Sequence, residues 1–488
     1  MLLLAGLYVV AIGLRAAVTP LWFDEIITYQ IANLGGPRTI VEALLAKADN
    51  HPPLDYIARH YAMAVFGGSE LAFRLPSIVA MLVASLCLYL IVLRRTSVLP
   101  ALAAFSFPFV TVAVRYASEG RGYAFLMASV CLAFLAWQRA AEKPTPVRLL
   151  FLLLCLSVGP YCHYYGVLNY GPIVIGEAWR SWENRKISWP IAGCILLSLV
   201  SLGLLVPFAI RATEFAPNFW VRFGPTSLVQ TYTHLLSSAI PAIAASLIVV
   251  ALLSLSPAAG PSARGGEPTA LPRHEVVAAI ALSLLPIATY VLALLVTRAF
   301  DQRYVLNTVF GVALLLAYLI HEATSRRPRY AQAVTLVFAL WAAGTLVLQA
   351  PREPAKPYAI RSDFVEVIEA SPLPVVVPDY HAYLRHRLYL PEALRSRLYY
   401  VADLGFAVKY ERKDTSDRML LNLRPFMQAN VVPFCDFVKR HPRFLMLTGE
   451  NGWLFPKLIE DRAQVSILAG SAPAHAILSV TLERPGNC

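Results

Sequence analysis

Long apolar segments separated by short polar stretches occupy the chain from its N-terminus to about residue 350. A helix needs about 20 mainly apolar residues to cross the hydrocarbon core of a bilayer, and its backbone hydrogen bonds are then satisfied internally. The pattern therefore predicts a polytopic α-helical membrane protein with about eleven transmembrane helices. The apolar runs lie near residues 2–19, 71–93, 98–114, 122–138, 147–162, 165–179, 189–210, 229–255, 275–297, 304–320 and 331–349.

The first apolar run has no small-residue cleavage site, and further runs follow it, so the pattern indicates a retained anchor. The segment 20–74 behind it is too long for a simple link. Its stretches Thr39–Ala48 and Leu54–Phe66 are amphipathic, and such helices commonly lie along a bilayer surface. We therefore expect juxtamembrane helices in this outer loop.

After Pro351 the apolar runs stop, and short apolar strands alternate with helical patterns. This predicts a small soluble α/β domain over residues 351–488, behind a transmembrane domain of residues 1–350. No Gly-rich phosphate loop of the dinucleotide type occurs there. The expected strands are Val375–Val377, Leu398–Val401, Phe444–Leu447, Val465–Leu468 and Ala476–Val480, and the expected helices are Phe434–Lys439 and Leu454–Asp461.

The composition agrees with a membrane protein. Apolar residues make up 57% of the 488 and charged residues 15%, with mean hydropathy +0.57. Soluble domains carry about 25% charged residues. The net charge of +12 comes mostly from short loops between the apolar runs, so it indicates no nucleic-acid partner.

Basic residues in those loops indicate the orientation, because Lys and Arg are enriched on the cytoplasmic side. If the N-terminus is inside, the basic loops face the cytoplasm, and an odd number of spans places segment 20–70 and residues 351–488 outside. We therefore expect a multi-pass protein with its N-terminus in the cytoplasm and its C-terminal domain in a periplasmic, extracellular or luminal space. Seven arginines at the outer ends blur the rule and become candidate site residues: Arg74, Arg115, Arg121, Arg211, Arg222, Arg298 and Arg303.

Five of the seven cysteines lie in or beside apolar runs, where a small apolar residue is the ordinary interpretation. Cys435 and Cys488 are the only candidates for a disulfide in an oxidising compartment. Their spacing does not decide whether they pair.

Two adjacent carboxylates, Asp24 and Glu25, stand where the first apolar run leaves the membrane, directly after Trp22 and Phe23. Acids at the edge of a membrane segment are usually functional, and a carboxylate in a partly dehydrated site can act as a general base. The alternative is a solvated acidic pair at a helix end.

Two histidines are further candidates. His51 precedes a proline pair that restricts the turn into the next helix, so it could contact a phosphate or ligate a metal rather than serve a structural purpose. His163 ends the fifth run beside three tyrosines, which an interfacial aromatic belt also explains. Both histidines with a carboxylate could hold a divalent cation, although no spacing rule connects them.

Six short motifs follow one another along roughly the first 350 residues: Asp24-Glu25, His51-Pro52-Pro53-Leu54, Ser69 to Ser77, Glu119-Gly120-Arg121-Gly122-Tyr123, His163-Tyr164-Tyr165 and Gln302-Arg303-Tyr304. Their order resembles that of the GT-C glycosyltransferases, in particular bacterial relatives of protein O-mannosyltransferases and of the aminoarabinose transferases that modify lipid A. Each motif is short, but the set is specific. The resemblance implies a multi-pass protein of the bacterial inner (cell) membrane with an extracytoplasmic C-terminal domain.

The resemblance implies that Asp24 activates the acceptor and that Glu25 binds or orients it. Gly120 departs from the family pattern Glu-Ala-Arg-x-Tyr. His51 stands where the aminoarabinose branch has Lys and agrees with the mannosyltransferase branch, which puts an aminoarabinose donor in doubt. The implied positions for the donor sugar and phosphate are His51, Glu119, Arg121, Tyr123, His163, Arg303 and Tyr304.

The arginines suit such a donor. A sugar carried on polyprenyl phosphate leaves behind a negative phosphate, which Arg121 and Arg303 could stabilise through charge-assisted hydrogen bonds. For Arg74, Arg211 and Arg298, snorkelling to lipid headgroups is the preferred interpretation.

The expected function is an inverting glycosyltransferase that moves a hexose or pentose from a polyprenyl-phosphate donor to a hydroxyl of a protein, lipid or glycan acceptor. Membrane lipids are further partners, and a divalent metal ion is the one cofactor left open. A lipid-linked sugar transporter or flippase is the first alternative, although no paired internal repeats occur. A membrane anchor whose soluble domain binds a partner is the second.

Overall fold

The computed structural model describes residues 1–215, 217–218, 223–255, 271–297, 299–324, 327–351, 361–449, 452–471 and 475–482. The chain divides into two compact units. We call Met1–Val18, His51–Pro207 and Val221–Glu353 the bundle unit, and Thr19–Asn50, Phe208–Trp220 and Pro354–Cys488 the sheet unit. The first part of the outer loop therefore groups with the C-terminal residues.

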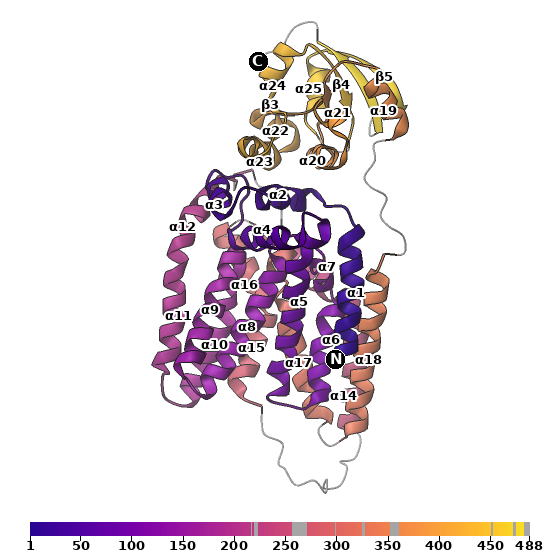
Figure 1. Ribbon diagram of the computed structural model, residues 1–488. Helices are drawn as coiled ribbons and strands as arrows, with labels where there is room; N and C mark the ends of the chain where they lie inside the picture. The colour runs from indigo at the N-terminus through magenta and orange to yellow at the C-terminus, as the bar shows by residue number, and fades with distance from the viewer. Residues whose placement is uncertain are drawn as a thin grey trace. The chain divides into compact units, whose positions relative to one another are not determined.

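The bundle unit is helical (Figure 1). Its elements are α1 (Leu2–Val18), α4 (Leu54–Phe66), α5 (Glu70–Leu93), α6 (Val98–Ser106), η1 (Phe107–Val110), α7 (Ala113–Tyr116), α8 (Tyr123–Glu142), α9 (Pro146–Cys162), η2 (Tyr164–Asn169), α10 (Tyr170–Glu183), α11 (Trp189–Ser201), η3 (Leu202–Leu205), α12 (Val206–Ala212), α13 (Ser227–Leu236), η5 (Ser237–Ala239), α14 (Ile240–Leu255), α15 (Arg273–Ser283), α16 (Leu285–Leu292), the π-helix η6 (Ala293–Thr297), η7 (Gln302–Val305), α17 (Thr308–Thr324) and α18 (Pro328–Gln349). Helix α12 belongs to this unit only as far as Pro207.

Every apolar run of the sequence is helical over most of its length, so the prediction of a polytopic helical protein is confirmed. Among the described residues, six helices are long and apolar enough to cross a membrane, or up to eight if each of two bent pairs is one span. The run 275–297 is such a pair: α15 and the following helix are bent by 50°. Pro286 explains the break, because its nitrogen carries no hydrogen to continue the α-helical bonds.

A buried carboxylate joins three helices at one end of the bundle. Glu275 of α15 is 1% exposed and accepts hydrogen bonds from Arg95 Nε, at 2.9 and 3.1 Å to its two oxygens, and from Gln138 Nε2 at 2.9 Å. Arg95 follows α5 and Gln138 lies on α8. The bidentate contact offsets the cost of burying the two charges.

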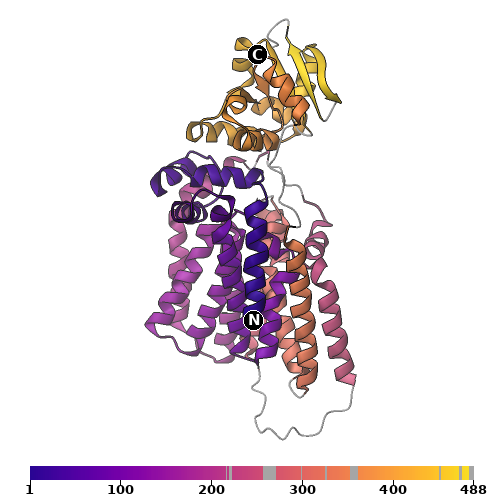
Figure 2. The ribbon, with the colours of Figure 1, turned by 45° about the vertical axis from the view of Figure 1, so that its right-hand side comes forward.

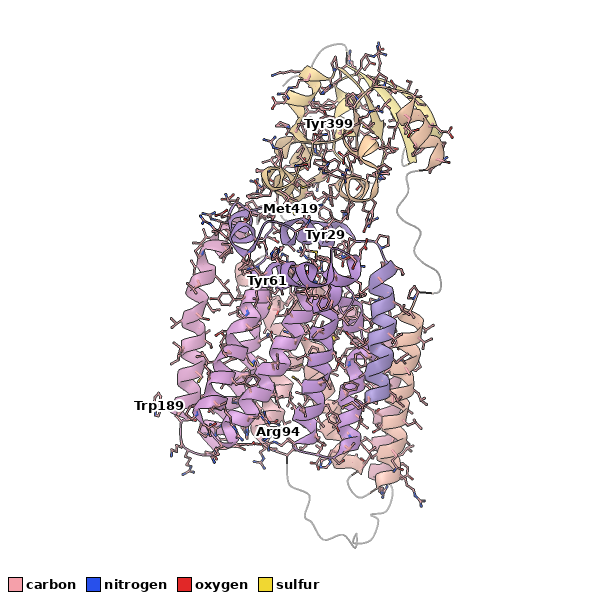
Figure 3. All side chains as sticks on the ribbon, viewed as in Figure 1. Tyr29, Tyr61, Arg94, Trp189, Tyr399 and Met419 are labelled. Carbon is pink, nitrogen blue, oxygen red and sulfur yellow. The ribbon has the colours of Figure 1, made fainter. Side chains whose placement is uncertain are left out.

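The opposite end of the same helices is the start of α5 and of α8, and α4 lies across it in Figure 1. Figure 3 shows Tyr61 of α4 at this end and Arg94 and Trp189 at the other. The sequence predicted an amphipathic helix over Leu54–Phe66, and α4 has the same bounds. Its position along a membrane surface stays a prediction.

The segment Thr19–Asn50 of the sheet unit, which we call the outer segment, contains α2 (Phe23–Ala32) and α3 (Pro37–Leu45). The segment Phe208–Trp220 contains η4 (Thr213–Phe215). The remaining helices are α19 (Ser362–Glu369), α20 (Tyr380–Tyr389), α21 (Glu392–Arg395), α22 (Leu404–Glu411), α23 (Thr415–Leu423), η8 (Arg424–Phe426), α24 (Phe434–Arg440) and α25 (Leu454–Glu460). Sequence periodicity predicted α3, α24 and α25 but not α2, because α2 begins at the aromatic and acidic residues that end an apolar run.

The sheet has six strands in the order β3-β2-β1-β4-β6-β5. Strands β3, β2, β1 and β4 are parallel, and β6 and β5 continue the sheet in antiparallel pairing. Figure 2 shows the long β5 and β6 in yellow. The strands are β1 (Val375–Val376), β2 (Leu398–Ala402), β3 (Val431–Pro433), β4 (Arg443–Leu447), β5 (Gln464–Ser471) and β6 (His475–Thr481).

The composition of each strand agrees with its position in the sheet. In the register, Val375 pairs with Leu398 on one side and Leu445 on the other, and all three are almost completely buried. Continuous Val and Leu runs suit a parallel sheet covered on both faces. Strand β3 ends in Pro433, which cannot donate a ladder hydrogen bond, and it lies at the sheet edge. All five predicted strands are confirmed, and β3 is an addition.

Cysteine chemistry distinguishes the two units. Cys435 in α24 of the sheet unit is disulfide-bonded. The prediction that concerns Cys488 lies outside the described residues. Among the cysteines that the structure describes, Cys87, Cys131, Cys155, Cys162 and Cys194 are free, and all five belong to the bundle unit.

A buried carboxylate organises the sheet unit. Asp417 of α23 is 4% exposed and accepts hydrogen bonds from the Asp403 backbone N–H at 3.0 Å, Trp453 Nε1 at 3.1 Å and the Tyr400 hydroxyl at 3.2 Å. Burial raises the pKa of Asp417 to about 7, although these hydrogen bonds act in the opposite direction. Burial also lowers the pKa of His386 in α20 to about 4.

These two groups have opposite effects on stability. A raised carboxyl pKa makes the sheet unit lose stability as pH rises from about 4 to about 7, and a lowered histidine pKa makes it lose stability as pH falls from about 6.5 to about 4. We predict that Asp417→Asn leaves the histidine effect, so that stability rises with pH between 4 and 6.5, whereas His386→Gln leaves the opposite slope. Each slope is at most about 1.4 kcal/mol per pH unit. Both pH slopes are measured by urea unfolding of the whole protein, followed through hydrogen exchange in β4. Equal slopes in the two variants would contradict the assignment of the two effects to Asp417 and His386.

Candidate functional site

A buried ion pair lies on the inner face of α4. Arg59 is 0% exposed, and its Nε and Nη2 donate to the two carboxylate oxygens of Asp55 at 3.1 and 2.7 Å. Asp55 precedes Arg59 by four residues, so one helix face presents both. A buried guanidinium needs such a partner, because an unpaired buried charge is strongly unfavourable.

The same guanidinium connects α4 to two other segments. It donates to the Phe73 carbonyl at 2.8 Å and to Ser77 Oγ at 2.9 Å, both on α5, and to the Arg121 carbonyl at 3.0 Å. Ser77 Oγ in turn donates to the Glu119 carbonyl at 2.7 Å. Arg59 and Ser77 therefore hold the backbone of the Glu119 to Tyr123 motif, which we call the EGRGY loop.

Both glycines of the EGRGY loop are required by packing. A Cβ atom added at Gly120 would lie 2.0 Å from the ring of Phe73, and one added at Gly122 would lie 2.6 Å from the Cys162 carbonyl oxygen. Even an alanine methyl has no room at either position. The departure of Gly120 from the Glu-Ala-Arg pattern is therefore explained by the Phe73 ring.

The side chain of Arg121 is directed to His51. Arg121 is 4% exposed, and its Nη2 lies 2.9 Å from His51 Nδ1. Because a guanidinium only donates, this histidine nitrogen accepts the hydrogen bond. The sequence treated these residues as two separate motifs, and the structure brings them together.

His163 lies next to this pair, with its ring centroid 5.2 Å from that of His51. It is 3% exposed, and its Nδ1 accepts a hydrogen bond from the Tyr165 backbone N–H at 3.2 Å. Burial, together with His51, Arg121 and Arg303, holds the pKa of His163 well below its usual value. The neutral ring then carries its proton on Nε2, which has no hydrogen-bond partner among the residues that the structure describes.

Three tyrosines surround the His163 ring. The ring centroids of Tyr123, Tyr304 and Tyr165 lie 5.3, 5.7 and 5.9 Å from it. Tyr165 and Tyr304 stack in parallel at 4.2 Å, and the Tyr165 hydroxyl donates to the Ala299 carbonyl at 3.0 Å. An interfacial aromatic belt was a sufficient explanation of Tyr165 in the sequence; the structure places this ring in the cluster around His163 instead.

Arg303 completes the cluster. Its guanidinium lies 5.8 Å from the Tyr123 ring centroid, and its Nε donates to Asp301 Oδ1 at 3.0 Å. Asp301 also accepts the Arg303 backbone N–H, so it caps η7 and orients the arginine. We call His51, Arg121, Tyr123, His163, Arg303 and Tyr304 the cationic cluster. Glu119 is half-buried, and the EGRGY loop places it two residues before Arg121.

Arg74 is a correction to the sequence analysis. Snorkelling to lipid headgroups was preferred for it, but Arg74 is 2% exposed and donates to the Ala16 carbonyl at 2.9 Å. It therefore ties α5 to the end of α1. Arg211 is exposed and donates to the Leu45 carbonyl, and Arg298 lies outside the described residues.

The acidic pair lies in the sheet unit, at the start of α2. Glu25 is 1% exposed and accepts a hydrogen bond from the Trp22 backbone N–H at 3.3 Å, as the acid of a capping box does. Asp24 is partly exposed, and its backbone carbonyl accepts a hydrogen bond from Thr28 Oγ1 at 3.0 Å. Glu25 therefore stabilises the helix end, while the Asp24 carboxylate is the more accessible of the two.

No three His, Cys, Asp or Glu side chains are grouped like metal ligands within the part of the chain that the structure describes. His163 uses Nδ1 for the Tyr165 backbone, and His51 uses a ring nitrogen for Arg121. The hypothesis of a cation held by both histidines and a carboxylate finds no support in this arrangement.

Sequence reasoning missed Asp55, Arg59 and Tyr165 as site residues. The signal for the first two was an acid and a base four residues apart on the face of α4 that also carries Tyr56 and Met63, both buried. For Tyr165 no local signal exists, because its stacking partner is 139 residues away in sequence, at Tyr304.

Residues 50–210 match the family model of the dolichyl-phosphate-mannose-protein mannosyltransferases. This range contains the EGRGY loop, His51 and His163. No protein among the curated sequences matches the chain.

The chain is similar to a solved structure of ArnT from Cupriavidus metallidurans bound to undecaprenyl phosphate, with a TM-score of 0.59 and 12% identity over 100% of this chain and 99% of that one. It is also similar to apo ArnT from that organism, with a TM-score of 0.52 and 14% identity over 98% and 97% of the chains. At these identities the likeness establishes the fold. Together with the apolar helices, this fold makes the chain an integral membrane protein.

We predict that Arg59→Lys loosens the EGRGY loop, because an ammonium cannot reach Asp55 and the three other acceptors at once. Hydrogen exchange in a peptide covering residues 117–124 should accelerate at least about tenfold, the equivalent of about 1.4 kcal/mol in local opening. Arg94→Lys, at the other end of the bundle, is the matched control. Unchanged exchange in Arg59→Lys would show that the guanidinium does not hold the loop.

Proposed function

We propose that this chain, which has the fold of the GT-C superfamily of membrane glycosyltransferases, moves one sugar from a polyprenyl-phosphate donor to an acceptor hydroxyl with inversion at the anomeric carbon. The observation that carries the proposal is the cationic cluster. In it Arg121 and His163 both lie next to His51, and Arg303 lies against Tyr123, whose ring packs on His163. The undecaprenyl phosphate of the similar ArnT structure is a ligand of the same class. The family match and the fold support a lipid-linked-donor glycosyltransferase in general.

The cationic cluster suits a phosphate that gains charge when its sugar leaves. Arg121 and Arg303 supply charge-assisted hydrogen bonds, and the Nε2–H of His163 supplies a neutral one. Buried donors are worth more than the same donors in water, because the surrounding tyrosine rings lower the local dielectric. Asp301 pairs with Arg303 and orients its guanidinium, and Asp55 pairs with Arg59.

Asp24 is the proposed general base. The acceptor O–H gives its proton to the Asp24 carboxylate while its oxygen bonds to the anomeric carbon. The bond between that carbon and the phosphate oxygen breaks, and its electron pair leaves with the polyprenyl phosphate. A single displacement of this kind inverts the anomeric centre. Glu25 acts by capping α2 and so orients Asp24.

The extracytoplasmic side is proposed for the cationic cluster. The EGRGY loop and α4 lie at the end of the bundle opposite Arg94 and Trp189 (Figure 3). The loop residues Arg94 and Arg95 belong to the basic set that the positive-inside rule assigns to the cytoplasm. The disulfide at Cys435 favours an oxidising compartment for the sheet unit.

Two variants separate the proposed roles. Asp24→Asn should lower the transfer rate by about 100-fold to 10,000-fold, the usual contribution of a general base, and leave binding of polyprenyl phosphate unchanged. Arg121→Ala should weaken that binding by about 10-fold to 100-fold, because a hydrogen bond to a charged group is lost. Binding of polyprenyl phosphate in detergent and transfer of a labelled sugar from polyprenyl phosphate are the two measurements.

Arg94→Ala is the matched control for the arginine change, since it removes a charge at the other end of the bundle. Undiminished transfer by folded Asp24→Asn would remove Asp24 from the mechanism. Wild-type binding by Arg121→Ala would remove the phosphate role of Arg121.

His163 offers a test of the neutral donor. His163→Gln keeps an N–H group near the position of Nε2, and His163→Phe keeps only the ring shape. We expect Gln to retain most of the polyprenyl phosphate affinity and Phe to lose about tenfold, because one buried hydrogen bond is worth about 1 kcal/mol or somewhat more to a charged acceptor. Equal affinities in the two variants would show that the N–H group is not used.

A further inference from the structure

The acidic helix α2 is attached to the C-terminal part of the sheet unit at its first residues. The Leu21 backbone N–H donates to the Tyr389 hydroxyl at 2.8 Å. The Phe23 ring packs edge-on against Tyr380 and His381, with centroids 4.9 and 4.6 Å away. Tyr380 and Tyr389 are the two ends of α20, so this helix contacts the chain directly before Asp24.

The end of the same outer segment is held by a different helix. Asn422 of α23 donates from Nδ2 to the Lys47 carbonyl at 3.2 Å. Lys47 has φ of 68°, a left-handed conformation that a non-glycine residue adopts only where the surrounding structure stabilises it. The segment 19–50 is therefore held at both ends.

The second short segment of the sheet unit is attached in the same way. Thr415 Oγ1, at the start of α23, donates to the Asn218 carbonyl at 3.3 Å. In the same segment Arg211 donates to the Leu45 carbonyl, and Glu214 forms an ion pair with Lys47 Nζ. Helix α23 thus contacts the end of the outer segment directly through Asn422, and it also contacts Asn218 of the second segment, which itself bonds the outer segment through Arg211 and Glu214.

The attachment through α20 lies at the carboxyl edge of the parallel strands. Helix α20 begins directly after β1, at the carboxyl end of the parallel strands, and β1 and β4 are the neighbours where the strand order reverses. Doubly wound domains bind their ligands at this position. Here Gly449, after β4, packs so closely on Asp379, before α20, that an added Cβ would lie 2.7 Å from the Asp379 Cβ. The residues that follow β1 contact the outer segment of the same chain.

We propose that the C-terminal α/β domain is the support that positions Asp24, and that Tyr389 and Asn422 are positioning residues for the transfer reaction. Helix α2 has 10 residues, and helices shorter than about 12 to 15 residues are marginal without tertiary contacts. The Glu25 cap stabilises the helix end but does not determine where the helix lies. The contacts from α20 and α23 supply that constraint.

The positioning role of Tyr389 and Asn422 rests on the proposed function of Asp24. Their attachment to the outer segment does not, so the experiment measures attachment and positioning separately. Hydrogen exchange of the full-length protein reports the attachment. Tyr389→Phe removes the acceptor of the Leu21 N–H, and Asn422→Ala removes the donor to Lys47. Tyr410→Phe is the matched control, because the Tyr410 hydroxyl bonds Glu460 on an exposed surface of the same domain.

We expect exchange across residues 19–32 to accelerate about fivefold in Tyr389→Phe, as the loss of one hydrogen bond implies, with unchanged exchange in β4. Exchange near Lys47 should accelerate in Asn422→Ala. Wild-type exchange in both variants would overturn the attachment whatever the reaction is.

Steady-state transfer from polyprenyl phosphate bearing a labelled hexose reports the positioning. In Tyr389→Phe we expect kcat to fall at least about threefold while the donor KM stays within twofold, because the proposed donor residues belong to the bundle unit. A purely structural defect would instead lower the fraction of folded protein and the amount of bound donor together. Faster exchange with wild-type kcat would overturn the positioning role. If the wild-type protein showed no transfer under any condition, the proposed function would be refuted. The attachment measured by hydrogen exchange would still hold.

Discussion

The bundle end that carries the cationic cluster depends on one buried guanidinium. Arg59 neutralises Asp55 and uses its remaining donors on α5 and on the carbonyl of Arg121. Burying a cation is costly, and only a planar group with five donors satisfies four acceptors on three segments at once. Because the Arg121 backbone is held from one side, its own guanidinium can be directed to His51 without loss of order in the loop.

The two proposed chemical roles belong to separately packed parts of the chain. The cationic cluster is built from helix ends and short turns of the bundle unit, whose opposite end is joined by Glu275. The acidic helix is built into the sheet unit, through Tyr389 and Asn422. A change in the C-terminal domain can therefore alter the acceptor side of the reaction while the donor side keeps its structure.

Local patterns in the sequence predicted the parts that local forces determine. Hydrophobic runs predicted the helices, and the surface helix Leu54–Phe66 and five strands were also predicted. The candidate cluster was found through short motifs, but its assembly was not. The bond between Leu21 and Tyr389 joins residues 368 apart, and no periodicity reports such a contact. The sequence marked Gly120 as a departure from a family pattern, and only packing against Phe73 explains it.

The most direct test of the central claim is the fate of the bond between sugar and phosphate. Purified protein in vesicles would receive polyprenyl phosphate bearing a labelled sugar, with a native membrane extract as the source of acceptor. The account predicts release of polyprenyl phosphate in equal amount to labelled product, and an inverted anomeric configuration in that product. Movement of intact lipid-linked sugar across the vesicle membrane with no release of polyprenyl phosphate would contradict it and identify a transporter.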